Sequence, residues 1–291
     1  MTISSTMETP AESRGRSARA RQLRRLLRKP NFLVGTVIVL SFLAVTVLAP
    51  LLTPFDPTES DFLSAQSPPV VGHPLGTDQY GRDLLTRVLY GSRTALLAIV
   101  VADGIALVAG SLLGLMAGFY GGATDSIIMR VVDVLLAFPY LLLALIIVAA
   151  LGPSLFNAMV AIGVVYTPQY ARLLRGKALS IRQQEYVHSA RALGARDWRI
   201  MLRHVLPNSM VPILVTATLQ AGTVIVETAG LSFLGLGAQP PTPDWGAILA
   251  DGQSYFLTSW WIATFPGLAI LVVVLGFNLV GDALRDTLEG A

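Results

Sequence analysis

FLVGTVIVLSFLAVTVLAPLLT, residues 32–53, decides the fold of this chain, because it contains no charged side chain. As an α-helix this stretch would extend about 33 Å, which is enough to cross a hydrocarbon core of about 30 Å. It exceeds the apolar part of a cleaved signal peptide, about 7–15 residues, and no small-x-small cleavage site follows it. We therefore interpret residues 32–53 as a membrane-spanning helix.

Other parts of the chain share this apolar character. Of its 291 residues, 53% are hydrophobic and only 13% are charged, against about 25% charged in ordinary soluble domains. Five further spans are predicted, at residues 94–119, 127–151, 155–174, 210 to about 229, and 262–280. The fold class is therefore an all-α polytopic membrane protein with six transmembrane helices. The chain has no cysteine and only three scattered histidines, so we predict no metal site.

The distribution of basic residues predicts the orientation. The tail before the first span holds eight Lys and Arg residues, and the stretch 172–207 holds eight more of the total of 21. By the positive-inside rule both lie in the cytoplasm, together with the two termini. We expect a basic tail over 1–31, an extracytoplasmic loop over 54–93, a five-helix core over 94–284 and a short cytoplasmic tail over 285–291. The basic tail is either solvated or an amphipathic helix on the inner leaflet. No nucleic-acid partner is implied.

The second predicted span carries small residues at every fourth position. Ala98, Ala102 and Ala106 are followed by Gly110, Gly114 and Gly118, a pattern that lets another helix approach closely. The stripe packs either within the chain or against a second pore subunit. Three prolines, Pro139, Pro168 and Pro266, interrupt later spans and predict kinks there.

Four ionisable residues lie within or near the apolar spans. A charged side chain facing lipid is costly, so each should face protein or water. Arg130 and Asp133 are three residues apart, and we expect a local ion pair between them. Asp103 and Glu227 are candidate pore-lining residues, with a structural hydrogen bond to a neighbouring helix as the alternative for each.

The segment QQEYVHSARALGARDWRIMLRHVLPN, residues 183–208, is the most informative part of the chain. We predict a helix over 185–193, a sharp turn at Gly194, and a second helix over 197–205 that Pro207 stops before the next span. These helices are too polar to insert into the membrane. They form either a rigid cytoplasmic knob that transmits motion from a docked partner or a plain solvated connection.

This segment resembles the coupling loop of ABC-importer permeases, of pattern E-A-A-x3-G-x9-I-x-L-P. His188, Ser189 and His204 depart from the general pattern. They fit the C-type permeases of the oligopeptide, dipeptide and nickel importers, for which the resemblance implies ATPase-coupling residues within 180–207. These are Glu185, Tyr186, Ala190, Arg191, Gly194, Ala195, Arg199, Arg203, Leu206 and Pro207.

Three further segments resemble the same subfamily. They are HPLGTD with GRD at residues 73–83, LSFLGLG at 231–237 followed by Pro240 and Pro241, and GD with LRD at 281–286. For LSFLGLG a tight turn at the outer interface is the simplest structural expectation.

The resemblance implies the type I ABC importer permease fold in the inner membrane of a prokaryote. Its implied partners are a second permease, two cytoplasmic ATPase subunits, an extracytoplasmic binding protein and the lipid bilayer. This chain lacks the phosphate-binding motif G-x4-G-K-[ST], so we expect no catalytic residue and no cofactor of its own, with ATP and Mg²⁺ used by the ATPases. Peptides are the expected substrates, with nickel chelates, glutathione or other small solutes as alternatives. An ion-coupled secondary transporter is the rival class, and we detect no internal repeat that would support it.

Overall fold

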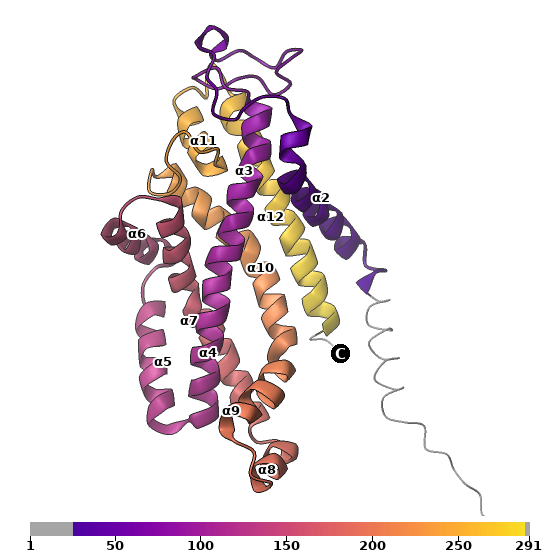
Figure 1. The fold of residues 1–291 in the computed structure, drawn as a ribbon, viewed down its shortest axis with the longest axis vertical. Helices are drawn as coiled ribbons and strands as arrows, with labels where there is room; N and C mark the ends of the chain where they lie inside the picture. Colours follow the sequence, from indigo (N-terminus) through magenta and orange to yellow (C-terminus); the bar gives the residue numbers. More distant parts are fainter. Residues whose placement is uncertain (1–25, 289–291) are drawn as a thin grey trace, which may run out of the picture.

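The fold is helical throughout most of residues 26–288, the part of the chain that the computed structural model describes. Its long helices run side by side, with an irregular loop at one end of the bundle and a short helical loop at the other (Figure 1). In chain order the helices are α2 (Pro30–Leu52), α3 (Leu84–Ala98), α4 (Gly104–Tyr120), α5 (Gly122–Leu136), α6 (Tyr140–Leu151), α7 (Leu155–Ile181), α8 (Glu185–Ala192), α9 (Asp197–Ile200), α10 (Leu206–Phe233), α11 (Trp245–Gln253) and α12 (Trp261–Leu288). Two π-helical segments, Ile99–Asp103 and Met201–Val205, join α3 to α4 and α9 to α10.

The length and composition of these helices show which of them could cross a membrane. Four helical stretches of the described chain qualify: Pro30–Leu52, Leu84–Tyr120, Asp197–Phe233 and Trp261–Thr287. The number rises to five if the bent pair α5 and α6 is one span. The predicted first span is thus confirmed as α2. Its apolar side chains face outward, with Val47 and Leu51 exposed by 71% and 82%, as lipid-facing residues would be.

The second span begins earlier than predicted. The sequence predicts residues 84–93 as part of the extracytoplasmic loop, whereas the helix of 37 residues runs from Leu84 to Tyr120. Asp83 caps this helix, because its carboxylate accepts hydrogen bonds from the backbone N–H and the hydroxyl of Thr86. Arg87, which lies within the predicted loop, is 2% exposed in the structure. Its charge is compensated by buried partners, so it does not prevent the helix from extending.

The third predicted span, residues 127–151, is a broken helix. α5 and α6 meet at 95°, much more than a proline kink within one helix. Pro139 lies outside both helices, with φ −57° and ψ 130°, and α6 begins at the next residue. Because α5 has only 15 residues, about 22 Å, it ends short of a full crossing and α6 projects sideways from the bundle (Figure 1).

The helix ends on the side predicted to be extracytoplasmic also differ from the prediction. α10 continues to Phe233, so the first three residues of LSFLGLG are helical and the turn lies at Leu234 and Gly235, where φ is +78°. The short helix α11 follows in a stretch that carried no helix prediction. At the other end α12 reaches Leu288, so residues 285–288 of the predicted cytoplasmic tail continue the helix. Residues 1–25 of the predicted basic tail and residues 289–291 lie outside the described part.

The small-residue stripe of α4 lies against α7 in the same chain. A Cβ atom built on Gly110 would lie 2.5 Å from the carbonyl oxygen of Thr167, and one on Gly114 would lie closer still to that of Ala171. Gly118 makes a similar approach to Arg175 and Ala178. Only glycine permits this separation of the two helices, so α4 and α7 form the tightly packed centre of the fold.

Two identical substitutions on α4 test this packing. Gly114→Ala should lower the midpoint of thermal unfolding in detergent, because the added methyl group must push α7 away at a cost of about 1–3 kcal/mol. Gly104→Ala is the matched control: a Cβ there meets nothing within 4 Å, and alanine favours a helix by up to about 1 kcal/mol. Equal midpoints for the two variants would show that the close approach does not matter for stability.

Candidate functional site

The α8–α9 loop, residues 182–205, is built around a turn at Gly194. Its φ of +79° lies in the left-handed region, which glycine adopts without a steric penalty. Gly194 N–H donates to the Arg191 carbonyl at 3.0 Å, and Ala195 N–H donates to the Ala190 carbonyl at 3.0 Å. These two bonds form a Schellman motif, which satisfies the last carbonyls of α8. The turn therefore fixes the direction in which the chain leaves α8.

The second helix of the loop does not stop at Pro207. α9, the π segment Met201–Val205 and α10 form one helical stretch of 37 residues, from Asp197 to Phe233. The prediction failed because Pro207 is the second residue of α10, directly after the π segment, and proline is tolerated in the first turn of a helix. The Asn208 amide donates to the His204 carbonyl at 2.6 Å, and the Ser209 hydroxyl donates to that of Val205 at 2.9 Å. The loop is thus continuous with a membrane-spanning helix.

An apolar cluster attaches the α8–α9 loop to the bundle. Val187, Ile200 and Val205 of the loop are each at most 1% exposed and pack with Leu115 and Phe119 of α4. Two other apolar side chains of the loop, Leu193 and Trp198, are 88% and 57% exposed. Leu202 is 52% exposed and lines an apolar groove with Leu112 of α4 and Met210 of α10. Exposed apolar side chains on a polar loop are typical of surfaces that contact other proteins.

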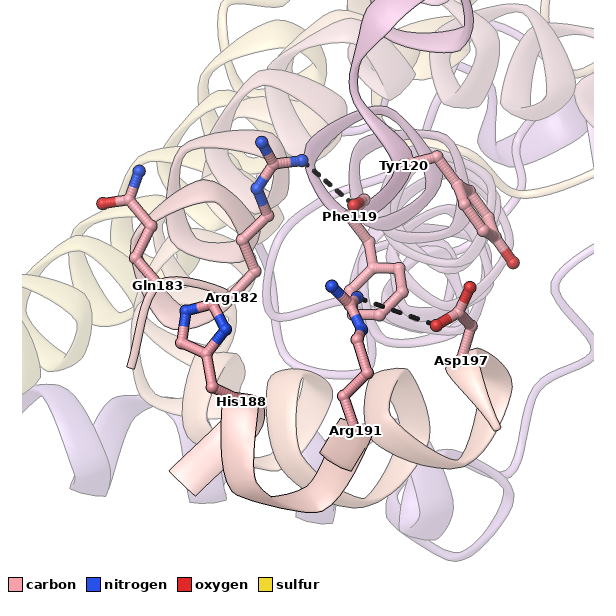
Figure 2. Close-up of a pocket in the computed structure, with 7 residues that line it drawn as sticks. All are labelled: Phe119, Tyr120, Arg182, Gln183, His188, Arg191 and Asp197. Carbon is pink, nitrogen blue, oxygen red and sulfur yellow. Dashed lines mark hydrogen bonds and ion pairs between the residues drawn. The ribbon is translucent and has the colours of Figure 1, made fainter. Parts of the chain in front are cut away.

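A cavity of about 620 Å³ lies between this loop and the end of α4. Its lining residues, shown in Figure 2, are Phe119, Tyr120, Arg182, Gln183, His188, Arg191 and Asp197. The Arg182 guanidinium donates to the carbonyls of Gly118 and Phe119 at 3.2 and 3.1 Å, and so caps the C-terminus of α4. Arg191 pairs with Asp197 at 3.7 Å and lies over the Phe119 ring, 5.4 Å from its centre. These contacts hold the two sides of the loop together.

The other predicted coupling residues are distributed over the same loop. The side chains of Glu185, Arg199, Arg203 and Pro207 are exposed, whereas Ala190, Ala195 and Leu206 are half-buried. The Tyr186 ring lies 5.9 Å from the His204 ring, which brings together two residues of the subfamily pattern that are separated in the sequence. The arrangement leaves the charged residues free to meet a partner.

The two acids predicted to line a pore lie apart, each beside a tyrosine of α7. Asp103, at the end of the π segment, is 7% exposed and accepts a hydrogen bond of 2.6 Å from the Tyr170 hydroxyl. Glu227 of α10 is half-buried and accepts one of 3.5 Å from the Tyr166 hydroxyl. Tyr166 and Tyr170 were missed in the sequence. Their spacing of four residues within an apolar helix was the signal, since it places both hydroxyls on one face.

The predicted ion pair between Arg130 and Asp133 is wrong. Asp133 instead accepts from Arg172 of α7 at 2.7 Å. A second bridge joins the same helices, where Arg175 binds Asp125 through two bonds of 2.5 and 2.7 Å. The bidentate geometry of an arginine with a carboxylate is stronger than a contact along one helix surface. These pairs fix α5 against α7.

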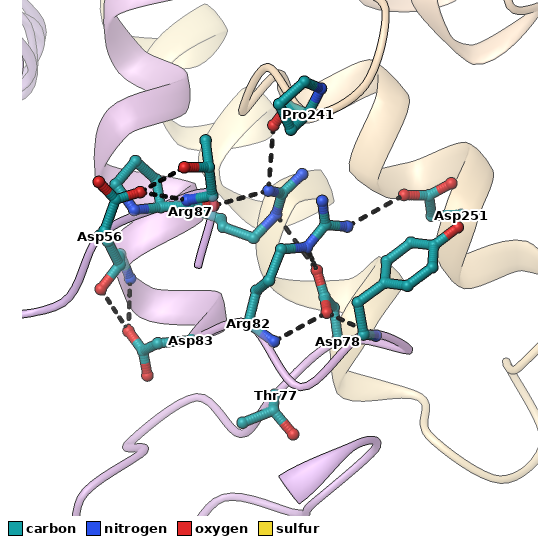
Figure 3. A network of polar contacts seen from close by, with 12 residues as sticks. Asp56, Thr77, Asp78, Arg82, Asp83, Arg87, Pro241 and Asp251 are labelled. Atoms are coloured by element: carbon teal, nitrogen blue, oxygen red, sulfur yellow. Dashed lines mark hydrogen bonds and ion pairs between the residues drawn. The ribbon is translucent and has the colours of Figure 1, made fainter. Parts of the chain in front are cut away.

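At the end of the bundle opposite the α8–α9 loop, the end predicted to be extracytoplasmic, a buried ionic cluster accounts for the motif at residues 73–83. Asp78 binds Arg82 Nε at 2.6 Å and Arg87 Nε at 3.3 Å, and all three side chains are at most 5% exposed (Figure 3). Arg87 also donates to the carbonyls of Pro57 and Pro241, while Arg82 approaches Asp251 of α11 at 3.8 Å. The cluster therefore joins the outer loop to the segment that follows α10.

The outer loops also contain carboxyl groups with shifted pKa values. A hydrogen bond from the Thr58 hydroxyl lowers the pKa of Asp56, and one from the Ser64 hydroxyl lowers that of Asp61. Burial raises the pKa of Asp244, which caps α11 by accepting from the Ala247 N–H at 3.1 Å. Within residues 26–288 no three acidic, histidine or cysteine side chains gather in a way that could hold a metal ion. These groups serve local structure.

Comparison with known proteins was made on the sequence and on the fold. The family model described as "Binding-protein-dependent transport system inner membrane component" matches residues 110–290. A second, described as "N-terminal TM domain of oligopeptide transport permease C", matches residues 17–69. Together the two models extend over most of the chain.

Curated relatives match nearly end to end. The dipeptide transport system permease protein DppC of Alkalihalophilus pseudofirmus is 47% identical over 257 residues, 88% of this chain and 84% of the relative. The probable D,D-dipeptide transport system permease protein of Escherichia coli is 46% identical, over 89% and 87%. The glutathione transport system permease protein of Pectobacterium atrosepticum is 43% identical, over 91% and 89%.

A solved structure shares the fold. It is the MetNI methionine ABC transporter in an inward-facing conformation, with a TM-score of 0.54 and 20% identity. The match covers 70% of this chain and 96% of that chain. At this identity the likeness concerns the arrangement of helices alone.

Proposed function

This chain belongs to the family of binding-protein-dependent transport system inner membrane components, and from that premise we propose that it forms half of the pathway through which an ATP-driven importer carries peptides. It is the permease subunit of an ABC importer. Relatives whose names specify dipeptides support the choice of substrate. Glutathione, itself a tripeptide and named for another relative, falls in the same chemical class.

The α8–α9 loop carries this proposal, as the docking surface for an ATPase subunit. Leu193 and Trp198 give it exposed apolar side chains, and Arg199 and Arg203 of the same loop are also exposed. Burial of apolar groups with charged residues at the rim is typical of specific protein interfaces. The turn and the apolar cluster described above hold this surface in a fixed position against the bundle.

The topology that we propose has six spans, with both termini and the α8–α9 loop in the cytoplasm. α7 is the sixth span of this topology. It is not selected as a span by length and composition, because it carries polar residues such as Gln169 and Arg172. Its side chains pack largely against other helices, so it does not need the apolar surface that lipid requires. The ends of the described chain support the shared side, since Lys29 and Asp286 form an ion pair of 3.2 Å.

The complete transporter that we propose contains this chain, a second and paralogous permease, two cytoplasmic ATPase subunits that use ATP and Mg²⁺, and an extracytoplasmic binding protein. Asp103 and Glu227 are our candidates for residues near the translocation pathway. The second permease would cover part of the surface that this chain leaves open beside α6 and α10. We place the transporter in the inner membrane of a prokaryote, and the description of the family supports this localisation.

Reconstitution tests the proposal directly. The four kinds of subunit are placed in proteoliposomes with the ATPases facing outward and the binding protein enclosed, and export of a radiolabelled dipeptide from the lumen to the ATPase side is measured. We expect transport that requires both ATP and the binding protein, and that persists when ionophores dissipate ion gradients. Transport driven by a proton or sodium gradient without ATP would instead support a secondary transporter.

A further inference from the structure

The break between α5 and α6 places an aromatic side chain at the open side of the bundle. Tyr140 is the first residue of α6, and 42% of its surface is exposed. α6 lies beside the outer half of α7 and near the outer end of α10 (Figure 1). In secondary transporters, interrupted helices contribute to substrate sites near the middle of the membrane. The surroundings of Tyr140 are therefore a place to look for a ligand site.

Three helices contribute one residue each to a cluster there. The ring of Tyr140 stacks on that of Tyr166 of α7, with centres 5.6 Å apart and planes at 23°. The Tyr166 hydroxyl donates to Glu227 Oε1 of α10 at 3.5 Å. Tyr166 is only 4% exposed, so it fixes the positions of the two outer members. We call Tyr140, Tyr166 and Glu227 the tyrosine–glutamate site.

The carboxylate of this site has no cation beside it. No lysine, arginine or histidine of residues 26–288 forms an ion pair with Glu227, and its one described hydrogen bond, from Tyr166, is long. Asp125 and Asp133 of the neighbouring α5, by contrast, each bind an arginine. An acid within a membrane-spanning helix is costly unless it meets an opposite charge or water. Glu227 is thus suited to a cation that comes from outside this chain.

We propose that the tyrosine–glutamate site binds the N-terminal ammonium group of a peptide during its passage, an inference that rests on the proposed function. The Glu227 carboxylate supplies the opposite charge, and the exposed Tyr140 ring offers a face on which a cation is attracted. Glu227 lies about two turns from the outer end of α10, where a delivered peptide would arrive. The ammonium group is common to all free peptides, so this site accepts many side chains and rejects blocked N-termini.

Protection from a chemical reagent gives the first test, made on the wild-type transporter. Dicyclohexylcarbodiimide adds to carboxyl groups in apolar surroundings, and mass spectrometry measures its addition to Glu227 in the reconstituted complex. A saturating dipeptide with a free amine should slow this labelling at least about fivefold, and the same dipeptide with an acetylated amine should not. Equal labelling with and without the free peptide overturns the inference.

Transport by substituted complexes gives the second test. Glu227→Gln keeps the shape and removes the charge, and we expect the rate of ATP-dependent dipeptide transport to fall about tenfold. Asp133→Asn, an acid-to-amide change at an exposed pair on α5, is the matched control and should transport at the wild-type rate. A transport rate of Glu227→Gln equal to the wild-type rate overturns the inference. It is also overturned if Glu227→Gln transports slowly but the free peptide does not protect Glu227 from labelling in the wild type. That combination assigns Glu227 to contact with another subunit. If the wild-type complex itself does not transport peptides, it is the proposed function that fails.

Discussion

Replacing Gly194 by proline should abolish ATP-driven peptide transport while the chain still inserts into the membrane. Proline fixes φ near −65°, whereas Gly194 has φ +79°. The substitution also removes the N–H that donates to the Arg191 carbonyl at 3.0 Å. The Schellman motif is then lost, and the chain leaves α8 in another direction. The surface that we assign to the ATPase would no longer face its partner, so hydrolysis and transport should become uncoupled.

The measurement is dipeptide transport and ATP hydrolysis by the same proteoliposomes. Gly194→Ala should show an intermediate defect, because alanine reaches the left-handed region at a cost of about 1–2 kcal/mol. Arg196→Pro is the matched control, since Arg196 lies in the same loop and already has φ −69°. Full coupled transport by Gly194→Pro would show that the direction of this turn is not needed for coupling.

Asp78→Asn should destabilise the protein strongly, because it leaves two buried arginines without their central carboxylate. The new amide oxygen can still accept hydrogen bonds from the backbone N–H groups of Tyr80 and Arg82, which the carboxylate accepts in the wild type, so the change removes mainly the charge. Removing one member of a buried ion pair typically costs about 3–5 kcal/mol. We therefore expect the midpoint of thermal unfolding in detergent to fall by on the order of 10 °C.

Asp286→Asn is the control for this effect. Asp286 also pairs with a cation, Lys29, but its side chain is 69% exposed. Exposed pairs contribute about 0–1 kcal/mol, so this variant should unfold close to the wild-type temperature. Similar shifts for Asp78→Asn and Asp286→Asn would mean that the outer cluster adds no more stability than a surface pair.

The sequence predicted what depends on local pattern. The uncharged run at residues 32–53 forms α2. A helix satisfies the backbone hydrogen bonds of so apolar a segment within a membrane. Gly194 was predicted as a turn, and its φ of +79° confirms this. Glycine is the residue that adopts this left-handed conformation without a steric penalty. In both places the physical cause lies within a few neighbouring residues.

Features that depend on distant partners were missed or wrong. Arg87 lies in the predicted outer loop, but the structure places it in a helix, where it pairs with Asp78 and two carbonyls. Asp133 forms an ion pair with Arg172 of α7 and not with the nearby Arg130. The packing of α5 on α7 brings Asp133 and Arg172 together. Pro207 was expected to end a helix, but it is the second residue of α10, and proline is tolerated in the first turn of a helix. None of these outcomes follows from periodicity or spacing.

The unbroken helix from Asp197 to Phe233 has a mechanical consequence. Its 37 residues span about 55 Å, so each end lies about 27 Å from the middle. A tilt of about 10° around that middle would move both ends by about 5 Å in opposite directions. An ATPase that pulls on the α9 end would therefore narrow one side of the membrane pathway as it widens the other. A tilt of this single helix would thus open the pathway to one side of the membrane while closing it to the other, without a separate gate on each side.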